Sequence, residues 1–90
     1  MHHGNPKTER IHAQIRPFVL EQLETRGVTD ISDHASLVEA GIIDSLGIFQ
    51  FIAFLESAFL IQISDDEIVL SNFESIDATV GFVASKQRLA

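Results

Sequence analysis

Ser45 and its neighbours form the part of the sequence best suited to chemistry. This serine follows Asp44 in the stretch A-G-I-I-D-S-L-G-I-F, residues 40–49, and hydrophobic residues continue almost unbroken to Ile63. Aspartate or serine at such a point is typical of a helix N-cap, whose side-chain oxygen accepts an N–H of the first turn. If Asp44 is the cap, Ser45 occupies the first helical position and its hydroxyl projects toward solvent. A phosphate attached there would face unsatisfied N–H groups and the positive end of the helix dipole.

Gly47 follows two residues later and is unfavourable inside a helix, where glycine costs about 0.5 to 1 kcal/mol relative to alanine. Its lack of a side chain leaves the flank beside Ser45 open. The stretch is therefore compatible with an ordinary helix start and also with a site built for access to the hydroxyl.

A serine can also be a catalytic nucleophile, which requires a base within hydrogen-bonding reach and a group that orients that base. The available bases are His2, His3, His12 and His34. His34 precedes Ser45 in the same segment, but no G-x-S-x-G turn accompanies the serine. We therefore disfavour an esterase built on Ser45 and His34, and we predict no catalytic residue and no enzymatic activity.

No metal site is predicted. The chain contains no cysteine, no pair of histidines on a predicted helix has ligand spacing, and the acidic run 65–67 lacks the glycine and ligand order of a calcium loop. Any thiol chemistry would therefore have to arrive with a prosthetic group.

The formal net charge of −7 is unevenly distributed. The basic side chains lie near the two ends of the chain, at Lys7, Arg10, Arg16, Arg26, Lys86 and Arg88. No Lys or Arg lies between Gly27 and Ser85, so nucleic acid, which needs a basic face, is excluded as a ligand. The acidic surface serves either solubility alone or docking onto basic patches of partner proteins.

The first predicted helix spans residues 7–25. Its apolar residues at helical spacing are Ile11, Ile15, Phe18, Val19 and Leu23, and Gly27 is a stop signal. Because Pro17 cannot donate to the carbonyl of Ala13, we expect a kink or a local break between Ala13 and Pro17.

Residues 27–44 are predicted to form a long loop, which in a small domain is usually functional. Its expected apolar anchors to the core are Val28, Ile31, Leu37, Val38, Ile42 and Ile43.

The second predicted helix begins at Asp44 or Ser45 and ends near Phe59 or Leu60. One arc of this helix forms a core stripe of Ile48, Phe51, Ile52, Leu55 and Phe59. The opposite arc carries polar residues and also Leu46, Phe49 and Ala53. These three are either covered by the loop or another helix, or they form an exposed apolar contact site beside Ser45.

The last third of the chain contains two more helix signals. Ser64 to Glu67 has the form of a capping box, which predicts a short turn of a third helix close to residues 65–70, and a last helix is expected over residues 76–88, with Ser71, Asn72 and Ser75 as N-cap candidates. The fold class is thus all-α: a four-helix bundle of three main helices plus one short third helix, with a long loop between the first two. We expect one domain over residues 1–90, with residues 1–6 disordered. No signal peptide or membrane span is predicted, so we expect a cytoplasmic protein. We also expect the protein to be a monomer.

The stretch L-V-E-A-G-I-I-D-S-L-G-I-F-Q-F-I-A-F-L-E-S-A-F-L-I-Q-I-S-D-D-E, residues 37–67, resembles the acyl carrier proteins. D-S-L opens an apolar helix after a loop ending in E-A-G, and F-x-x-x-I-x-D-x-E and N-F-x-S-I follow at the right distance. The resemblance covers about residues 8–88.

The resemblance implies that Ser45, flanked by Asp44 and Leu46, is esterified by a 4′-phosphopantetheine arm donated from coenzyme A. The arm would supply the thiol that this cysteine-free chain lacks, and acyl or aminoacyl groups would travel on it as thioesters. The implied partners are a phosphopantetheinyl transferase, an acyl- or aminoacyl-activating ligase and a downstream transferase or synthase, in lipid or secondary-metabolite biosynthesis.

The best-known fatty-acid carriers place several acids along the helix after the serine, whereas this chain has Glu56 alone there. We therefore expect docking through Leu46, Phe49 and Ala53, with Asp44 and Glu56 giving orientation. Because the second helix is rich in phenylalanine, we expect a filled interior and a short or polar cargo. The alternative from another class is an unmodified helical interaction domain in which Ser45 is only a cap.

Overall fold

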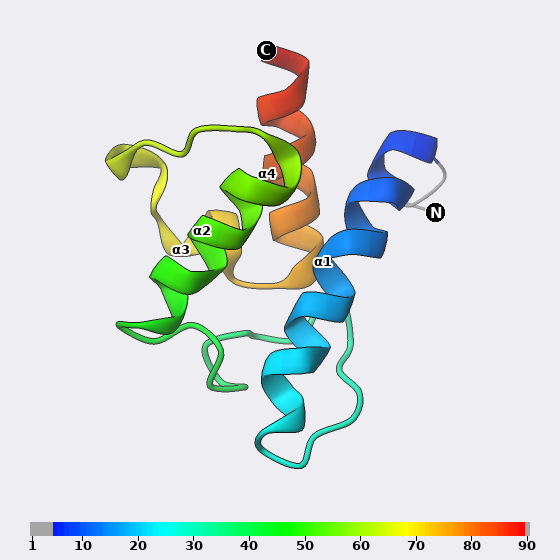
Figure 1. Cartoon of the computed structure of the whole chain (residues 1–90), viewed down its shortest axis with the longest axis vertical. Helices are drawn as coiled ribbons and strands as arrows, with labels where there is room; N and C mark the ends of the chain where they lie inside the picture. The colour runs from blue at the N-terminus through cyan, green and yellow to red at the C-terminus, as the bar shows by residue number, and fades with distance from the viewer. Residues whose placement is uncertain (1–4, 90) are drawn as a thin grey trace.

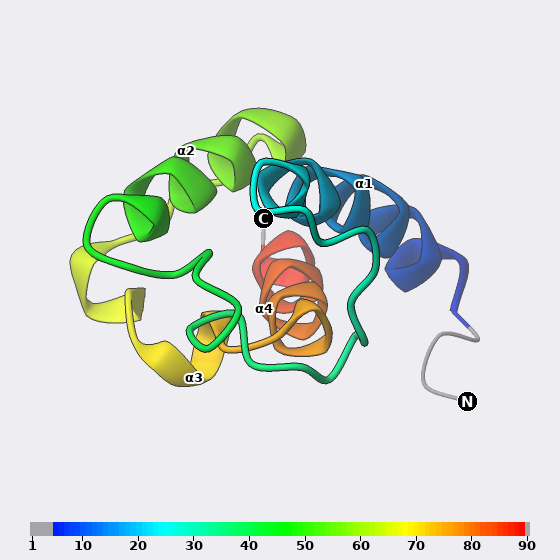
Figure 2. The ribbon, with the colours of Figure 1, turned by 90° about the horizontal axis from the view of Figure 1, so that it is seen from below.

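The computed structural model describes residues 5–89. Its helices are α1 (Pro6–Glu24), α2 (Gly47–Phe59), α3 (Leu70–Phe73) and α4 (Ile76–Leu89), with a short 3-10 turn, η1 (Asp65–Glu67), before α3. Within the described range no β-strand is present, and the predicted all-α fold of four helices is confirmed (Figure 1). In Figure 2 α4 is seen end-on, with α1, α2 and α3 arranged around it and the long loop crossing below. None of the helices in residues 5–89 is long and apolar enough to span a membrane.

Helix α1 begins one residue before its predicted start. The side chain of Asn5 accepts a hydrogen bond of 2.7 Å from the N–H of Lys7, and Pro6 occupies the first turn, where its missing N–H costs nothing. The expected disorder therefore does not extend to Asn5 and Pro6, while residues 1–4 lie outside the described part of the chain.

Of the two outcomes predicted near Pro17, a kink or a local break, the break is wrong, because α1 continues through this residue without interruption. Pro17 and Ala13 are both exposed, whereas Ile15 and Val19 beside them are fully buried. Burial of this apolar face stabilises the helix by more than the one missing hydrogen bond costs.

A series of aromatic contacts runs through all four helices. The ring of Phe18 in α1 stacks on Phe54 of α2 at 4.2 Å between centroids, and Phe51 of α2 meets the edge of Phe73 in α3 at 6.3 Å. Phe73 in turn packs edge-to-face against Phe82 of α4 at 5.2 Å. Phe51 and Phe73 are fully buried, so the centre of the bundle is filled by rings in favourable geometries.

The loop between α1 and α2 is held to the bundle by backbone and ionic contacts. Leu37 is buried, and its N–H donates to the carbonyl of Glu74 at 2.8 Å. The carboxylate of Asp33 accepts from Arg16 at 2.8 Å and lies 2.9 Å from Nε2 of His12, which ties the loop to α1. Burial raises the pKa of Asp33, but hydrogen bonds and charges from His12 and Arg16 outweigh it and hold this pKa below its usual range.

Four of the six expected loop anchors are at least half-buried. Leu37 and Ile42 are buried, and Ile31 and Ile43 are half-buried. Val28 and Val38 are 39% and 44% exposed, so the expectation that they anchor the loop is wrong. The loop follows the surface at these two positions.

The short helix expected close to residues 65–70 is present in two separate pieces, the 3-10 turn η1 and the four-residue helix α3. The capping box is present: the side chains of Ser64 and Glu67 each bond the other's backbone N–H and close η1. Val69 is extended, with φ −125° and ψ 148°, and it separates η1 from α3. Lys86 on α4 donates to Glu67 at 2.9 Å and fixes η1 against the bundle.

Helix α4 is confirmed within one residue of its predicted end. Ser75 is its N-cap, because its hydroxyl oxygen accepts the N–H of Ala78 at 3.0 Å.

Candidate functional site

Ser45 is exposed and lies in the turn immediately before α2. Helix α2 begins at Gly47, two or three residues later than expected, although the N–H of Ile48 already bonds to the carbonyl of Asp44 at 3.1 Å. The hydrogen-bonded turn that starts at Asp44 therefore leads directly into α2.

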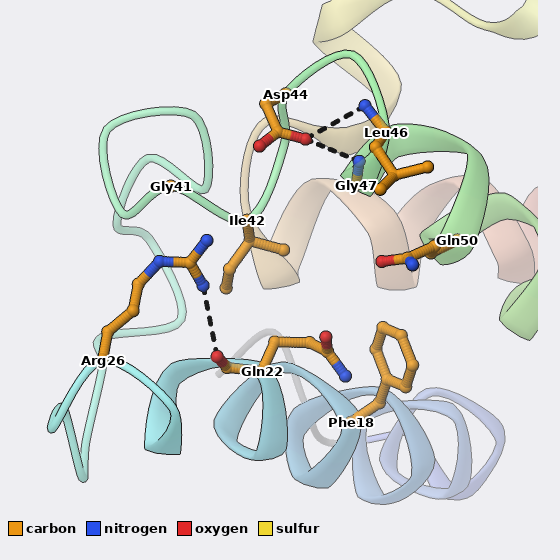
Figure 3. Close-up of a pocket in the computed structure, with 9 residues that line it drawn as sticks. All are labelled: Phe18, Gln22, Arg26, Gly41, Ile42, Asp44, Leu46, Gly47 and Gln50. Carbon is orange, nitrogen blue, oxygen red and sulfur yellow. Dashed lines mark hydrogen bonds between the residues drawn. The ribbon is translucent and has the colours of Figure 1, made fainter.

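The carboxylate of Asp44 caps the start of α2. Its Oδ1 accepts the N–H groups of Gly47 at 2.6 Å and Leu46 at 3.1 Å (Figure 3). The bond from Gly47 is the main reason that the pKa of Asp44 is lowered; desolvation opposes it, and the bond from Leu46 and the charge of Arg26 add to it.

This cap changes the expected role of the helix start. The N–H groups of Leu46 and Gly47 are already bonded to Asp44, so the expectation that a phosphate on Ser45 would use free N–H groups is wrong for these two. A phosphate at this position must find its compensating charge elsewhere.

Gly47 is required by packing. A Cβ atom at this residue would overlap the carbonyl oxygen of Ile42 and lie 3.0 Å from Oδ1 of Asp44. The absence of a side chain therefore lets the loop fold back against the helix start, which places Ser45 at the tip of a tight turn.

A pocket of about 150 Å³ opens between the C-terminal part of α1 and the start of α2. We call it the α1–α2 pocket; its lining residues are Phe18, Gln22, Arg26, Gly41, Ile42, Asp44, Leu46, Gly47 and Gln50 (Figure 3). Both chain neighbours of Ser45 are among them. The contributions of Gln22, which lies on α1, and Arg26, which lies in the turn just after α1, were not foreseen, because only the packing of this region beside the loop brings them here. The one signal in the sequence was that Arg26 is the last basic residue before the acidic segment.

Arg26 lies beside Gly41, in the loop that leads to Ser45. Its Nη1 donates to the carbonyl of Gln22 at 3.2 Å, and its Nε would be 3.2 Å from a Cβ at Gly41. Gly41 has φ +84°, a conformation that favours glycine. The guanidinium therefore packs against bare backbone just before the site.

The apolar residues on the outer arc of α2 are exposed. Leu46 and Phe49 are 66% and 62% exposed, and Ala53 is exposed as well. The alternative in which the loop or a helix covers Leu46 and Phe49 is therefore wrong. We call these three residues the Leu46–Phe49–Ala53 face.

On the opposite arc the predicted core stripe is confirmed for Phe51, Ile52, Leu55 and Phe59. Ile48 is only half-buried, because it lies in the first turn of α2, at the edge of the bundle.

Two other predicted residues have partners inside the fold. Glu56 is half-buried, and its Oε2 accepts the N–H of Ile63 at 2.9 Å, which closes the turn after α2. Nδ1 of His34 lies 2.6 Å from Oδ2 of Asp77 on α4. Asp77 thus holds His34 against the first turn of α4.

The residues around Ser45 fit a group attached through a phosphate ester. The hydroxyl is exposed on a turn whose conformation is set by Asp44 and Gly47, and an exposed apolar face and a partly polar pocket flank it.

Comparison with known families agrees with this reading. The family model described as phosphopantetheine attachment site matches residues 13–83, which include the described helices from within α1 to within α4. A comparison with curated proteins finds no match. Because the matched region covers most of the chain and contains the whole site, the protein belongs to the phosphopantetheine attachment site family, the carrier proteins that bind a 4′-phosphopantetheine prosthetic group.

Proposed function

We propose that Ser45 is the attachment point of the 4′-phosphopantetheine arm, and that the protein carries thioester-bound acyl or aminoacyl groups between partner enzymes. The observation that carries this proposal is the exposed Ser45 hydroxyl on the turn capped by Asp44. In the loading step a bond forms between Ser45 Oγ and the phosphorus that carries the pantetheine, the pyrophosphate bond of coenzyme A breaks and adenosine 3′,5′-bisphosphate leaves, and the hydroxyl proton passes to a base on the transferase. The bound arm supplies the thiol that a chain without cysteine lacks.

In this proposal the residues around Ser45 hold the turn and take no part in making or breaking covalent bonds. Asp44 holds the turn through the N–H groups of Leu46 and Gly47, and the close approach of Gly47 to Ile42 keeps the turn tight. The proposed role of this chain is to present the hydroxyl, while the partner enzymes provide catalysis.

The proposed docking surface is the Leu46–Phe49–Ala53 face. Apolar side chains this exposed beside a functional hydroxyl favour burial against a partner. The net charge of −7 would speed association with basic surfaces of the phosphopantetheinyl transferase and the activating ligase. Asp44 is the acid closest to this face in the chain, and we propose that it and Glu56 orient the partner.

We further propose a short or polar cargo, such as an amino acid or a small acyl group. The stacked rings of Phe18 and Phe54, with the edge-to-face contact between Phe51 and Phe73, occupy the volume that a long acyl chain would need. Inserting a chain would separate these contacts, and close-packed interiors resist this.

The proposal is tested by intact mass measurement after incubation with a phosphopantetheinyl transferase and coenzyme A. The wild-type protein should gain the mass of one 4′-phosphopantetheine, and Ser45→Ala should gain nothing. Ser57→Ala is the matched control, since Ser57 is an exposed serine of α2, and it should be modified like wild type. Added mass on Ser36, Ser57 or Ser64 would contradict the assignment, and no added mass in any variant would favour the unmodified interaction domain.

A further inference from the structure

The side-chain amides of Gln22 and Gln50 both line the α1–α2 pocket, one from α1 and one from α2. Figure 3 shows them directed into the space between the two helices, with the ring of Phe18 beside them. Among residues 5–89, neither side-chain amide has a hydrogen-bond partner, although Gln22 is half-buried. Two carboxamides facing the same pocket offer donors and acceptors to a neutral polar group.

The pocket also contains one cation close to the attachment point. Arg26 lines the same pocket as Asp44 and Leu46, the two chain neighbours of Ser45, and its charge contributes to the lowered pKa of Asp44. Asp44 already uses the N–H groups of Leu46 and Gly47. The guanidinium of Arg26 is therefore the group in this pocket that is best placed to compensate a phosphodiester on Ser45.

The size of the pocket limits what it can hold. Its volume of about 150 Å³ is that of a cavity which holds one benzene-sized group, which is far less than a complete phosphopantetheine arm. The unit of the arm next to the phosphate is branched, with geminal methyl groups, a hydroxyl and an amide. Phe18 and Ile42 offer apolar contacts for the methyl groups, and Gln22 and Gln50 offer partners for the hydroxyl and the amide.

We propose that the α1–α2 pocket holds the phosphate-proximal, pantoyl part of the arm, with Arg26 facing the phosphodiester and Gln22 and Gln50 facing the hydroxyl and amide. This inference rests on the proposed attachment at Ser45. Holding the first unit of the arm fixes the direction in which the rest extends, and it leaves the thiol end outside the pocket for partner enzymes.

The test compares the apo- and holo-proteins by NMR after mass measurement has established that the arm is attached. We expect nuclear Overhauser contacts between the geminal methyl protons of the arm and the protons of Phe18 and Ile42, together with shifts of the side-chain amide signals of Gln22 and Gln50. In the double variant Gln22→Ala/Gln50→Ala these contacts should be lost. The matched control is Gln14→Ala, which removes an exposed glutamine of α1 that is not among the residues of this pocket, and it should retain them.

The outcomes separate the two proposals. Complete attachment without contacts to Phe18 or Ile42, and with shifts confined to residues next to Ser45, would overturn the pocket assignment and leave the carrier function intact. Absence of attachment would overturn the proposed function itself. If the double variant does not fold, as judged by its helical circular dichroism, Arg26→Gln replaces it and should weaken the same contacts.

Discussion

The backbone of Gly47 lies so close to the carbonyl oxygen of Ile42 that no side chain fits between them. This contact folds the end of the long loop onto the first residue of α2 and brings the N–H of Gly47 to 2.6 Å from Oδ1 of Asp44. The turn that presents Ser45 therefore depends on a glycine that makes no contact through a side chain.

Gly47→Ala should destabilise the protein, although alanine is the better helix former. The added methyl would displace the Ile42 carbonyl, and overpacking of this kind typically costs about 1 to 3 kcal/mol. Chemical denaturation measures the effect. Gly81→Ala in α4 is the control, because a Cβ there meets nothing within 4 Å, and it should stabilise the protein by up to about 1 kcal/mol. Equal stabilisation by both changes would show that the turn is not tight.

Ser45→Ala should abolish loading while leaving the free energy of unfolding within about 0.5 kcal/mol of wild type, as for other exposed substitutions. The reason is that Asp44, and not Ser45, caps α2. Thermal melting of the apo-proteins checks the stability. A larger loss would mean that the serine hydroxyl also holds the turn.

Phe49→Ala and Phe51→Ala should have opposite effects, although both residues lie on α2. Phe49 is 62% exposed, and its truncation should slow transfer of the arm with a stability change below about 1 kcal/mol. Phe51 is fully buried, and its truncation should cost about 3 to 5 kcal/mol. The rate of loading and the midpoint of denaturation, measured on the same samples, distinguish them; unchanged loading by Phe49→Ala would argue against the Leu46–Phe49–Ala53 face.

The protein should lose stability in acid below about pH 4. The pKa values of Asp33 and Asp44 are both lowered in the folded state, while an aspartate in the unfolded chain has a pKa of about 3.9. The stabilisation is therefore complete at a pH above the pKa of aspartate in the unfolded chain. It is lost as the pH falls through the lower pKa values of the folded state, because the unfolded chain then binds more protons. Melting temperature measured between about pH 6 and about pH 2 follows this loss, and Asp33→Asn should make the decline shallower. An undiminished decline in this variant would show that the Asp33 contacts with Arg16 and His12 do not contribute.

Leu60→Gly should stabilise the protein. Leu60 ends α2 in the left-handed conformation, with φ 55° and ψ 47°, and its side chain is 90% exposed. A left-handed conformation costs a residue other than glycine roughly 1 kcal/mol, and little burial is lost with this side chain. A rise in the denaturation midpoint is expected; a fall would reveal a contact of Leu60 that offsets the strain.

The sequence by itself determined the helical class, the positions of the main helices and the family. These features depend on local patterns: the spacing of Ile11, Ile15 and Val19 defines a buried face of α1, and Ser64 with Glu67 defines a capping box. The D-S-L motif at the start of an apolar helix likewise lies in one short stretch of the chain, so the family could be recognised without the fold.

Only the tertiary structure decided how the surroundings of Ser45 are built. The overlap that excludes a side chain at Gly47 comes from the carbonyl of Ile42, and the α1–α2 pocket joins Gln22 and Arg26 to Gln50 across a long stretch of chain. The continuity of α1 through Pro17 and the exposure of Phe49 also depend on which faces the other elements cover. Local patterns specify hydrogen bonds and side-chain faces within a few residues, whereas close approach and burial depend on segments that are distant in sequence and meet only when the bundle packs.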